Sequence, residues 1–425
     1  MIEKLFENRQ IELDEFTLAH LTKNLGIIKI PSKVEDAVNR INKTELLDIA
    51  DDVLEAKELI FMVVSNLSDS FITACKSNAT ESQKKGFKTL NSKVLKNQTR
   101  VKNKYTYTKI INLLVKIGVF EKGRNYSVGN RSNEFRLTDK YFGKGIVEYK
   151  AKSRCVLSKI KNREIKNIEL ISESSIATNE LINFSKIVFP TDEEAVEFLL
   201  KTPKNKRGDS IVMLGKSNRE GFKNCVFIED YVQILRYLRN MAIPIVTSSK
   251  GGHRVITAYN LLPSVLRPLV KFKGEVSVES DYTCLHPNIV NFIYKGSGRT
   301  VTHEEVAKFL NISKLEAKIE HLSFFNKKWS AMINSSVFKY YWLNERSMMM
   351  NIFNRKEELG YKSTSEDCFY FETKLMEQNI KDLTGMGIDV LYCFDCLYSN
   401  KANQKTVKEV MDRNAKLFGI NTKIN

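Results

Sequence analysis

The chain of 425 residues lacks the features that mark membrane-spanning, secreted and disordered proteins. Its longest apolar run, residues 59–64, is far too short to span a bilayer. The first ten residues, MIEKLFENRQ, contain no apolar segment of the kind that directs secretion. Seven scattered cysteines, an odd number, argue against a disulfide framework, and an apolar fraction of 42% argues against wholesale disorder. These absences predict a soluble protein of the cytoplasm.

Motifs of several enzyme classes are also missing. The sequence contains no G-x-S-x-G and no P-loop, and its serines and five histidines are too scattered to indicate a nucleophilic triad. Cys393 and Cys396 form a C-x-x-C, but no second pair of Cys or His stands at zinc-site spacing. We therefore expect both cysteines to be core or strand residues. The seven prolines are too few for a rigid spacer, and no internal repeat is present.

Positive charge is what the sequence has in excess: 67 Lys and Arg stand against 50 Asp and Glu, a formal net charge of +17. Such an excess predicts a polyanionic partner, DNA or RNA, because cationic side chains that neutralise phosphates release counterions. The chain is also rich in Lys, Asn and Ile, so a merely soluble basic protein with lysine-rich codon use is the alternative. Charge alone favours nucleic acid without establishing it.

The length suggests about three domains, and composition and periodicity divide the chain into four regions. Residues 1–75 carry helical periodicity, with apolar residues at three- and four-residue steps. Residues 76–145 begin with a polar, basic stretch and continue into a helix and a hairpin. Residues 146–245 mix basic helices with β-like segments and form a connecting region. Residues 246–425 carry the motifs of a catalytic domain.

One helix of the second region has an apolar face made by residues at helical spacing: Ile110, Leu113, Leu114 and Ile117. Gly118 ends this helix, and the segments NYSVG (125–129) and NEFRLT (133–138) are typical of two short strands around a turn. A helix followed by such a hairpin resembles a winged helix-turn-helix.

The winged-helix resemblance covers residues 76–145 and implies binding to DNA or RNA. It implies phosphate contacts from basic residues on the recognition helix and near the wing: Lys109, Lys116, Arg124, Arg131 and Arg136. A winged helix that contacts protein, or a plain helical hairpin, is the alternative.

A strand that ends in an acid stands in the fourth region, in the segment EVSVESDYTCLHPNIVNFIY (275–294). Val276 and Val278 alternate as inward-facing strand residues, and the strand then presents the carboxylate of Asp281. Glu279 lies on the same strand face as Asp281, as an extra acid or as a solvated edge residue. For Asp281 itself, a strand-end cap or turn residue is the alternative to a functional role.

The segment GHRVITAYNLLPSVLRPLVKFKGEVSVESDYTCLHPNI resembles the entry to the palm of A-family DNA polymerases, the group that includes bacterial DNA polymerase I. Those enzymes show T-G-R-L-S-S, P-N-L-Q-N-I-P, an I-R and A-D-Y-S-Q-I-E-L-R-I in this order. The counterparts here stand in the same order at residues 253–255, 260–263, 266–267 and 280–286. The resemblance implies an α+β fold: a right-hand-like palm with small helical fingers, after helical and winged-helix regions and a thumb-like connecting region.

The family's second aspartate lies in a hairpin written V-H-D-E, and the segment GMGIDVLYCFDCLYSN supplies Asp395 as its counterpart. Phe394 replaces the His of that motif and Cys396 replaces the Glu, which puts the second carboxylate in doubt. Single-subunit phage RNA polymerases also lack an acid after the Asp. A charge within an apolar strand is costly unless it is paired or metal-bound, so Asp395 favours a functional role.

The resemblance implies that Asp281 and Asp395 bind Mg²⁺ or Mn²⁺, with a contribution from the backbone carbonyl of Tyr282. Nucleotidyl transfer uses two such ions roughly 4 Å apart to stabilise the attacking and leaving oxygens. It also implies catalytic roles for Arg254 and Arg267, for which surface ion pairs are the alternative.

Two further roles concern the incoming nucleotide. The resemblance implies that Lys327 or Lys328 contacts the nucleoside triphosphate, although the Arg and the Y-G of the family's R-x3-K-x6-Y-G helix are absent here. His286 takes the place of a Glu that packs under the incoming sugar and excludes a 2′-hydroxyl. Either ring nitrogen of His286 is able to bond that hydroxyl instead, and a core histidine is the alternative.

The leading hypothesis is a compact polymerase of phage or plasmid type that uses nucleoside triphosphates and Mg²⁺ or Mn²⁺ in the cytoplasm of a bacterial host. The alternative is a non-catalytic replication initiator or transcription regulator with a degenerate palm. A third hypothesis is a phage defence or structural component that only binds RNA. The sequence leaves open whether the product is DNA or RNA, whether template or primer is needed, and whether the protein is a monomer. No membrane partner is expected.

Overall fold

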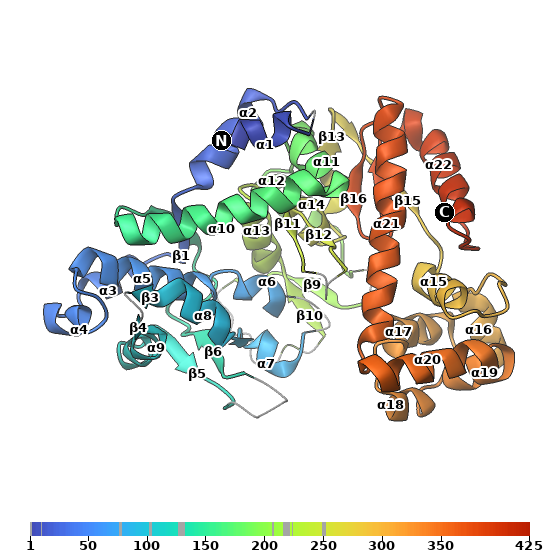
Figure 1. The fold of residues 1–425 in the computed structure, drawn as a ribbon, viewed down its shortest axis with the longest axis horizontal. Helices are drawn as coiled ribbons and strands as arrows, with labels where there is room; N and C mark the ends of the chain where they lie inside the picture. The colour runs from blue at the N-terminus through green and yellow to red at the C-terminus, as the bar shows by residue number, and fades with distance from the viewer. Residues whose placement is uncertain are drawn as a thin grey trace.

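The computed structural model describes residues 2–9, 11–75, 79–101, 104–125, 132–205, 208–215, 222, 224–248 and 252–425. In this part of the chain, helices alternate with small sheets of two or three strands (Figure 1), which confirms the predicted α+β class. None of the described helices is both long enough and apolar enough to cross a membrane. The described residues form three buried apolar cores.

The first core belongs to an N-terminal lobe, residues 27–160. β1 (Ile27–Pro31) pairs antiparallel with β7 (Ile146–Lys150), which brings the two ends of this lobe together. α5 (Val53–Ser65) runs through its centre and buries every side chain from Leu59 to Val64. The other elements of the lobe are α3 (Val34–Asn39), α4 (Lys43–Leu47), α6 (Ser70–Ala74), α7 (Glu81–Lys84), β2 (Lys88–Thr89), α8 (Ser92–Thr99), β3 (Arg100–Val101), β4 (Lys104–Tyr105), α9 (Tyr107–Lys116), β5 (Phe120–Lys122) and β6 (Glu134–Leu137). The core is continuous from α5 to α9, across the change of composition near residue 75.

The second half of this lobe follows the chain order β2, α8, α9, β5, β6, with β3 and β4 between the two helices, and its sheet has the order β2-β6-β5. α9 buries Ile110, Leu113 and Leu114, and β6 occupies the second predicted strand. The structure describes only Asn125 of the first predicted strand, residues 125–129. β5 pairs with β6 because Phe120, directly after the helix, packs on Phe135 with ring centroids 6.2 Å apart. Asn125 lies in a loop, and residues 126–129 lie outside the described residues.

α10 (Arg154–Glu173) connects the N-terminal lobe to the rest of the molecule. Val156 and Ile160 in its first half belong to the first core, whereas Ile168 and Ile171 in its second half belong to a second core. α1 (Ile2–Glu7) and α2 (Glu15–Asn24) join that second core, as does α11 (Ser175–Asn183). Figure 1 shows these helices lying together above the N-terminal lobe.

The third core gathers the connecting region and the segment before the strand that ends in Asp281. Leu235 and Leu238 of α13 and Tyr259 of α14 are among its fully buried side chains. Its elements are η1 (Phe184–Lys186), β8 (Ile187–Val188), α12 (Asp192–Leu200), β9 (Ser210–Val212), β10 (Cys225–Phe227), α13 (Ile228–Leu238), β11 (Ile245–Val246), β12 (Val255–Ile256), α14 (Ala258–Leu261), η3 (Arg267–Leu269), β13 (Lys271–Phe272) and β14 (Glu275–Val276).

A three-stranded antiparallel sheet separates the second core from the third. Its order is β15 (Val278–Asp281), β17 (Cys396–Ser399), β16 (Leu391–Cys393). Tyr392 and Leu397 point into the second core, while Leu391, Cys393, Cys396 and Tyr398 point into the third. The two cysteines are buried strand residues, as predicted. Val276 was predicted to face inward, but it is 53% exposed because β14 pairs with β13, outside this sheet.

Helices from the C-terminal half pack on this sheet and extend away from it. α21 (Ser363–Gly385) follows a helical lobe and returns the chain to the sheet, where α22 (Gln404–Leu417) packs beside it (Figure 1). The helical lobe consists of α15 (Leu285–Ile293), α16 (His303–Leu310), α17 (Lys314–Phe324), α18 (Trp329–Ile333), α19 (Phe338–Asn344) and α20 (Arg346–Leu359), and η4 (Lys401–Asn403) precedes α22.

Glu58 ties the ends of the N-terminal lobe to its central helix. Its fully buried carboxylate accepts hydrogen bonds from the Tyr149 hydroxyl at 3.0 Å and from the backbone N–H groups of Lys152 and Ser153 at 2.7 and 2.9 Å. Because a hydrogen bond to a charged group contributes about 1.5–3 kcal/mol, we predict that Glu58→Ala lowers the free energy of unfolding by about 3 kcal/mol or more. Urea denaturation measures the change. Glu35→Ala, which truncates an exposed glutamate of α3, should leave the midpoint unchanged, and equal stability of the two variants would contradict the prediction.

Candidate active site

The two aspartates identified in the sequence meet at one end of the three-stranded sheet. Asp281, the last residue of β15, pairs in register with Cys396, and Asp395 is the residue before Cys396. The backbone N–H of Tyr282 donates to the carbonyl oxygen of Asp395 at 3.2 Å. Residues 114 positions apart in the sequence (395 − 281) therefore occupy neighbouring positions on adjacent backbones.

Asp395 lies in the turn between β16 and β17 rather than within a strand. The turn has two residues, and Phe394 adopts a left-handed conformation with φ of 59°, as a tight hairpin requires. Desolvation in this turn raises the pKa of Asp395, and the nearby carboxylate of Glu372 raises it further. Among the described residues, no side chain donates a hydrogen bond to the Asp395 carboxylate. The turn thus holds a half-buried acid in a site that is short of positive charge.

A buried ion pair lies beside this turn. Glu372 of α21 is 1% exposed, and its two carboxylate oxygens accept from Nε and Nη2 of Arg254 at 2.7 and 2.5 Å. Nε2 of His286 lies 2.6 Å from the same carboxylate. The Arg254 guanidinium also stacks on the ring of Phe369 at 4.0 Å and approaches that of Phe394 at 5.1 Å. Arg254 and His286, predicted separately, are joined by an acid that the sequence analysis missed.

The charge state of Glu372 follows from these contacts. Burial alone would raise its pKa, but the Arg254 guanidinium and the His286 ring outweigh desolvation and hold the pKa at about 2. Glu372 is therefore ionised at neutral pH, and its charge is balanced mainly by Arg254. A signal for it was present in the sequence, because Glu372 occupies an otherwise buried face of α21 with Cys368, Leu375 and Met376.

A close approach of two backbones makes the ion pair possible. Gly252 has φ of 65°, a conformation that favours glycine, and a Cβ atom there would overlap with the backbone of Phe369. The loop that carries Arg254 consequently lies directly on α21, one turn before Glu372. This contact explains why the residue before His253 and Arg254 is glycine.

The side chains of Arg267 and Tyr282 are both engaged in contacts within the protein. Arg267 packs against the rings of Tyr259 and Tyr398 at 5.8 and 5.9 Å and donates to the Tyr398 hydroxyl at 3.3 Å, so it supports the sheet face toward the third core. The side chain of Tyr282 is 1% exposed, and its hydroxyl donates to the Met411 carbonyl at 2.8 Å. Only the backbone of Tyr282 remains for contact with a substrate or ion.

The two candidate triphosphate lysines lie in the loop between α17 and α18, in the helical lobe. Lys327 forms an ion pair with Glu320 at 2.7 Å, and the Ser335 hydroxyl donates to the same carboxylate. Lys328 lies over the ring of Tyr361 at 5.7 Å. These contacts hold both lysines within the helical lobe rather than at the sheet.

Four of the five predicted phosphate-binding residues are engaged with carboxylates on the N-terminal lobe, and Arg131 lies outside the described residues. Lys109 and Lys116 of α9 pair with Asp48 and Glu45, each at 2.6 Å. Arg124 pairs with Glu134, and Arg136 with Glu121 and Asp139. The side chains of Lys109 and Lys116 remain 54% and 72% exposed. Exposed ion pairs contribute at most about 1 kcal/mol, so phosphates are able to compete for these lysines.

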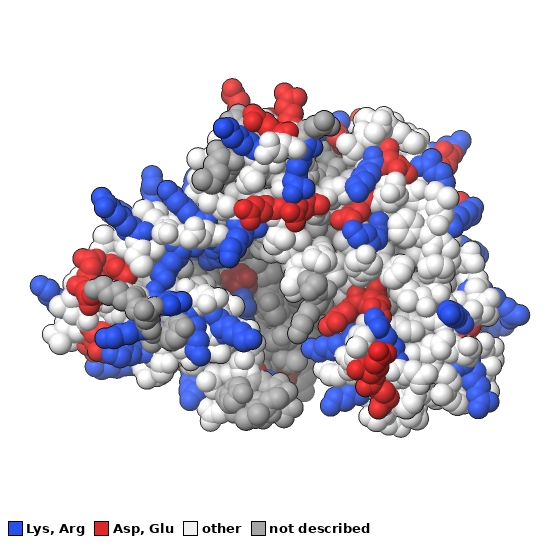
Figure 2. Space-filling view, in the orientation of Figure 1, with Lys and Arg blue, Asp and Glu red and all other residues white. Residues whose placement is uncertain are grey.

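A hollow opens between the N-terminal lobe and the helices that follow it. A cavity of about 610 Å³ is lined by Lys29, Lys88 and Arg163, and also by Asp69 and Glu164, which pair with Lys88 and Arg163. Figure 2 shows Lys and Arg gathered over the N-terminal lobe and α10 on this face of the molecule. α10 alone carries five cations, Arg154, Lys159, Lys161, Arg163 and Lys166.

The ion pair at Glu372 generates a prediction for stability. Removing one partner of a buried pair leaves an uncompensated charge and costs about 3–5 kcal/mol, whereas replacing both by apolar residues is often neutral. We predict that Arg254→Met and Glu372→Met each destabilise the protein by that amount and that the double variant is more stable than either single variant. Urea denaturation at pH 7 measures all four proteins of this cycle, and additive losses would contradict the pairing.

The pH dependence of Arg254→Met provides a second readout of the same pair. In the wild type the folded-state pKa of Glu372 lies below its ordinary value, so its contribution is complete above about pH 4.5 and is lost only as the pH falls toward 2. Without the guanidinium, burial raises that pKa, and stability is then lost as the pH rises through it. The stability deficit of the variant should therefore shrink between pH 7 and pH 5, and a constant deficit would speak against an ionised Glu372.

Comparison with known proteins does not assign this arrangement to a family. No protein-family model matches the chain, and no curated protein matches it. The functional conclusion therefore depends on the residues and contacts described above.

Proposed function

We propose that this protein is a metal-dependent nucleotidyltransferase, a compact nucleic-acid polymerase whose reaction takes place at Asp281 and Asp395. One observation carries the proposal: the register of β15 with β17 sets these two acids on neighbouring backbone positions, as the resemblance to A-family polymerases requires. The order of the surrounding elements supports it, because a long helix, α21, precedes the hairpin that carries Asp395.

The donor groups at this end of the sheet suit Mg²⁺ or Mn²⁺. Carboxylate and carbonyl oxygens are the ligands that such hard cations prefer, and Asp281, Asp395 and the carbonyl of Tyr282 supply them. The half-buried carboxylate of Asp395 receives no hydrogen bond from a side chain of the described residues, so a cation would satisfy it. When bound, two such ions stabilise the attacking and leaving oxygens of phosphoryl transfer.

The side chains beside the two aspartates hold one another in place, and we assign them no direct part in the reaction. Glu372 holds the guanidinium of Arg254 flat on Phe369 and holds the ring of His286 through Nε2. Because Nε2 is engaged, Nδ1 is the nitrogen of His286 that remains for a substrate hydroxyl. The arrangement gives His286 a fixed orientation five residues beyond Asp281, the last residue of the strand.

Binding of nucleic acid is supported by charge and by topology. The excess of 17 positive charges favours a polyanion. The chain order β2, α8, α9, β5, β6 with strand order β2-β6-β5 suits the winged helix-turn-helix proposed for residues 76–145. The five cations of α10 add to the positive surface that a polyanion would meet.

Two departures favour the non-catalytic alternative, a replication initiator or regulator. Lys327, a candidate for the triphosphate, is held by Glu320 in the helical lobe, and Cys396 stands where the family has a second acid. A protein with a degenerate palm would keep nucleic-acid binding and lack nucleotide incorporation. The next experiment separates the two functions.

We predict that Asp281→Asn and Asp395→Asn each reduce Mg²⁺-dependent incorporation of labelled nucleotides on a primed template by about 1,000-fold or more. Loss of a metal ligand removes several kcal/mol of transition-state stabilisation, and each 1.4 kcal/mol corresponds to about tenfold in rate. Nucleic-acid binding should stay near the wild-type level. Asp412→Asn, the same change at a half-exposed residue paired with Lys416, serves as the control. Incorporation absent from the wild type, or retained by either site variant, would remove the catalytic assignment.

The ribose preference tests the role of His286. We predict that the wild type accepts ribonucleotides and that His286→Ala loses about tenfold in ribonucleotide efficiency, because a site that bonds a hydroxyl discriminates against its loss. His286→Gln keeps a donor toward Glu372 and controls for damage to the ion pair. The measurement compares matched ribo- and deoxyribonucleotides. Strong wild-type preference for deoxyribonucleotides that is relaxed by the alanine variant would instead identify a steric gate.

A further inference from the structure

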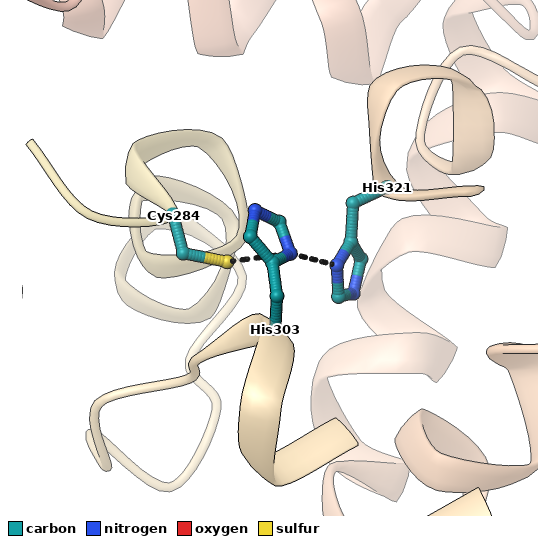
Figure 3. A group of neighbouring side chains, drawn as sticks. All are labelled: Cys284, His303 and His321. Atoms are coloured by element: carbon teal, nitrogen blue, oxygen red, sulfur yellow. Dashed lines mark hydrogen bonds between the residues drawn. The ribbon is translucent and has the colours of Figure 1, made fainter. Parts of the chain in front are cut away.

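A second group of metal-binding side chains lies in the helical lobe, apart from the two aspartates. Cys284, His303 and His321 converge from three places: the residue before α15, the first residue of α16 and the last turn of α17 (Figure 3). Sγ of Cys284 lies 3.5 Å from Nδ1 of His303, which lies 2.8 Å from Nδ1 of His321. All three ligand atoms are within 4.8 Å of one another.

The group is enclosed. Cys284 and His321 are 8% and 6% exposed, and His303 is half-buried. A thiol and two imidazoles shielded from water in this way present three donor atoms to one ion.

The surroundings orient the ligand atoms toward one point. The hydroxyl of Tyr341 bonds Nε2 of His321 at 2.8 Å, which leaves Nδ1 facing the other two residues. An outer hydrogen bond of this kind is the usual partner of a metal-bound histidine. Cys284 is held in a left-handed conformation with φ of 56°, which costs a non-glycine residue about 1 kcal/mol and aims its side chain at His303.

We propose that Cys284, His303 and His321 bind one zinc ion, with a fourth coordination position taken by water. Thiolate and imidazole are the ligands that zinc selects, and three protein ligands with one water are a common zinc arrangement. The ligands stand 19 and 18 positions apart in the sequence, far from the local pairs that mark a zinc motif. This spacing explains why the sequence analysis, which searched for local pairs, found no zinc site.

Such an ion would fasten the helical lobe to the sheet. Cys284 stands three residues after Asp281, the last residue of β15, whereas His303 and His321 belong to two helices of the lobe. Binding would replace the short contact between the two rings by bonds to a common centre. The site concerns the folding of this lobe, so it stands or falls independently of nucleotidyl transfer.

Metal content and cobalt substitution test the proposal on the full-length protein. We expect the dialysed wild type to retain one equivalent of zinc per chain, and chelation to lower its melting temperature by several degrees. Replacement by Co²⁺ should give the absorption of a four-coordinate ion together with a thiolate-to-cobalt band. Cys284→Ser should abolish that band, while Cys368→Ser, which changes an equally buried cysteine of the same half of the molecule, should keep it.

Two further variants guard against a loss of folding in Cys284→Ser. His303→Asn changes the half-exposed ligand and should also lose stoichiometric zinc. Tyr341→Phe keeps all three ligands and should weaken zinc binding by about 10- to 100-fold, since it removes only the outer hydrogen bond. A wild type without stoichiometric zinc, or a cobalt spectrum that Cys284→Ser leaves unchanged, would overturn the site.

Discussion

The buried carboxylate of Glu372 is the interaction on which the arrangement of the candidate active site depends. It joins α21 to the loop of Arg254 and to the first turn of α15, three segments that are far apart in the sequence. A buried acid without partners would take up a proton, and the bidentate guanidinium is what keeps this one ionised. Packing alone would leave these segments free to slide, whereas an ion pair with fixed geometry sets their register.

The ion pair also sets the electrostatics of the turn that carries Asp395. Arg254 is committed to Glu372, so its charge is already balanced and only partly offsets the acids nearby. Desolvation, and after it the carboxylate of Glu372, raises the pKa of Asp395 more than His286 and Arg254 lower it. With Asp281 on the adjacent backbone, the end of the sheet presents two acids at neighbouring positions. Carboxylates are ligands that a divalent cation takes, and this chemistry is the basis of the proposed metal site.

The sequence predicted elements whose signal is local, together with the long-range approach implied by motifs spread over residues 253–395. The helix at 107–116, the long helix before Asp395 and the approach of Asp281 to Asp395 belong to this class. The pairing of β1 with β7 was not predicted, because nothing in either strand specifies a partner more than a hundred residues away. Glu372 was missed for a related reason: its partners come from other segments, and only a polar residue on a buried helix face indicated them.

The two proposed metal sites differ in chemistry and lie within four residues of each other, at the end of β15 and just beyond it. The oxygen ligands at Asp281 suit a hard cation, while the thiol and imidazoles at Cys284 suit a softer one. The type of donor atom would therefore determine which metal ion each site prefers. Neither site would need to exclude the other site's metal by shape alone. The end of β15 is also held by backbone bonds from the C-terminal residues, at 2.9 Å between N of Asn425 and O of Asp281 and 2.7 Å between N of Thr283 and O of Lys423. A strand fixed on both of its edges up to Thr283 leaves Cys284 as the first residue free to turn, and its left-handed conformation is the point at which the chain leaves the sheet for the helical lobe.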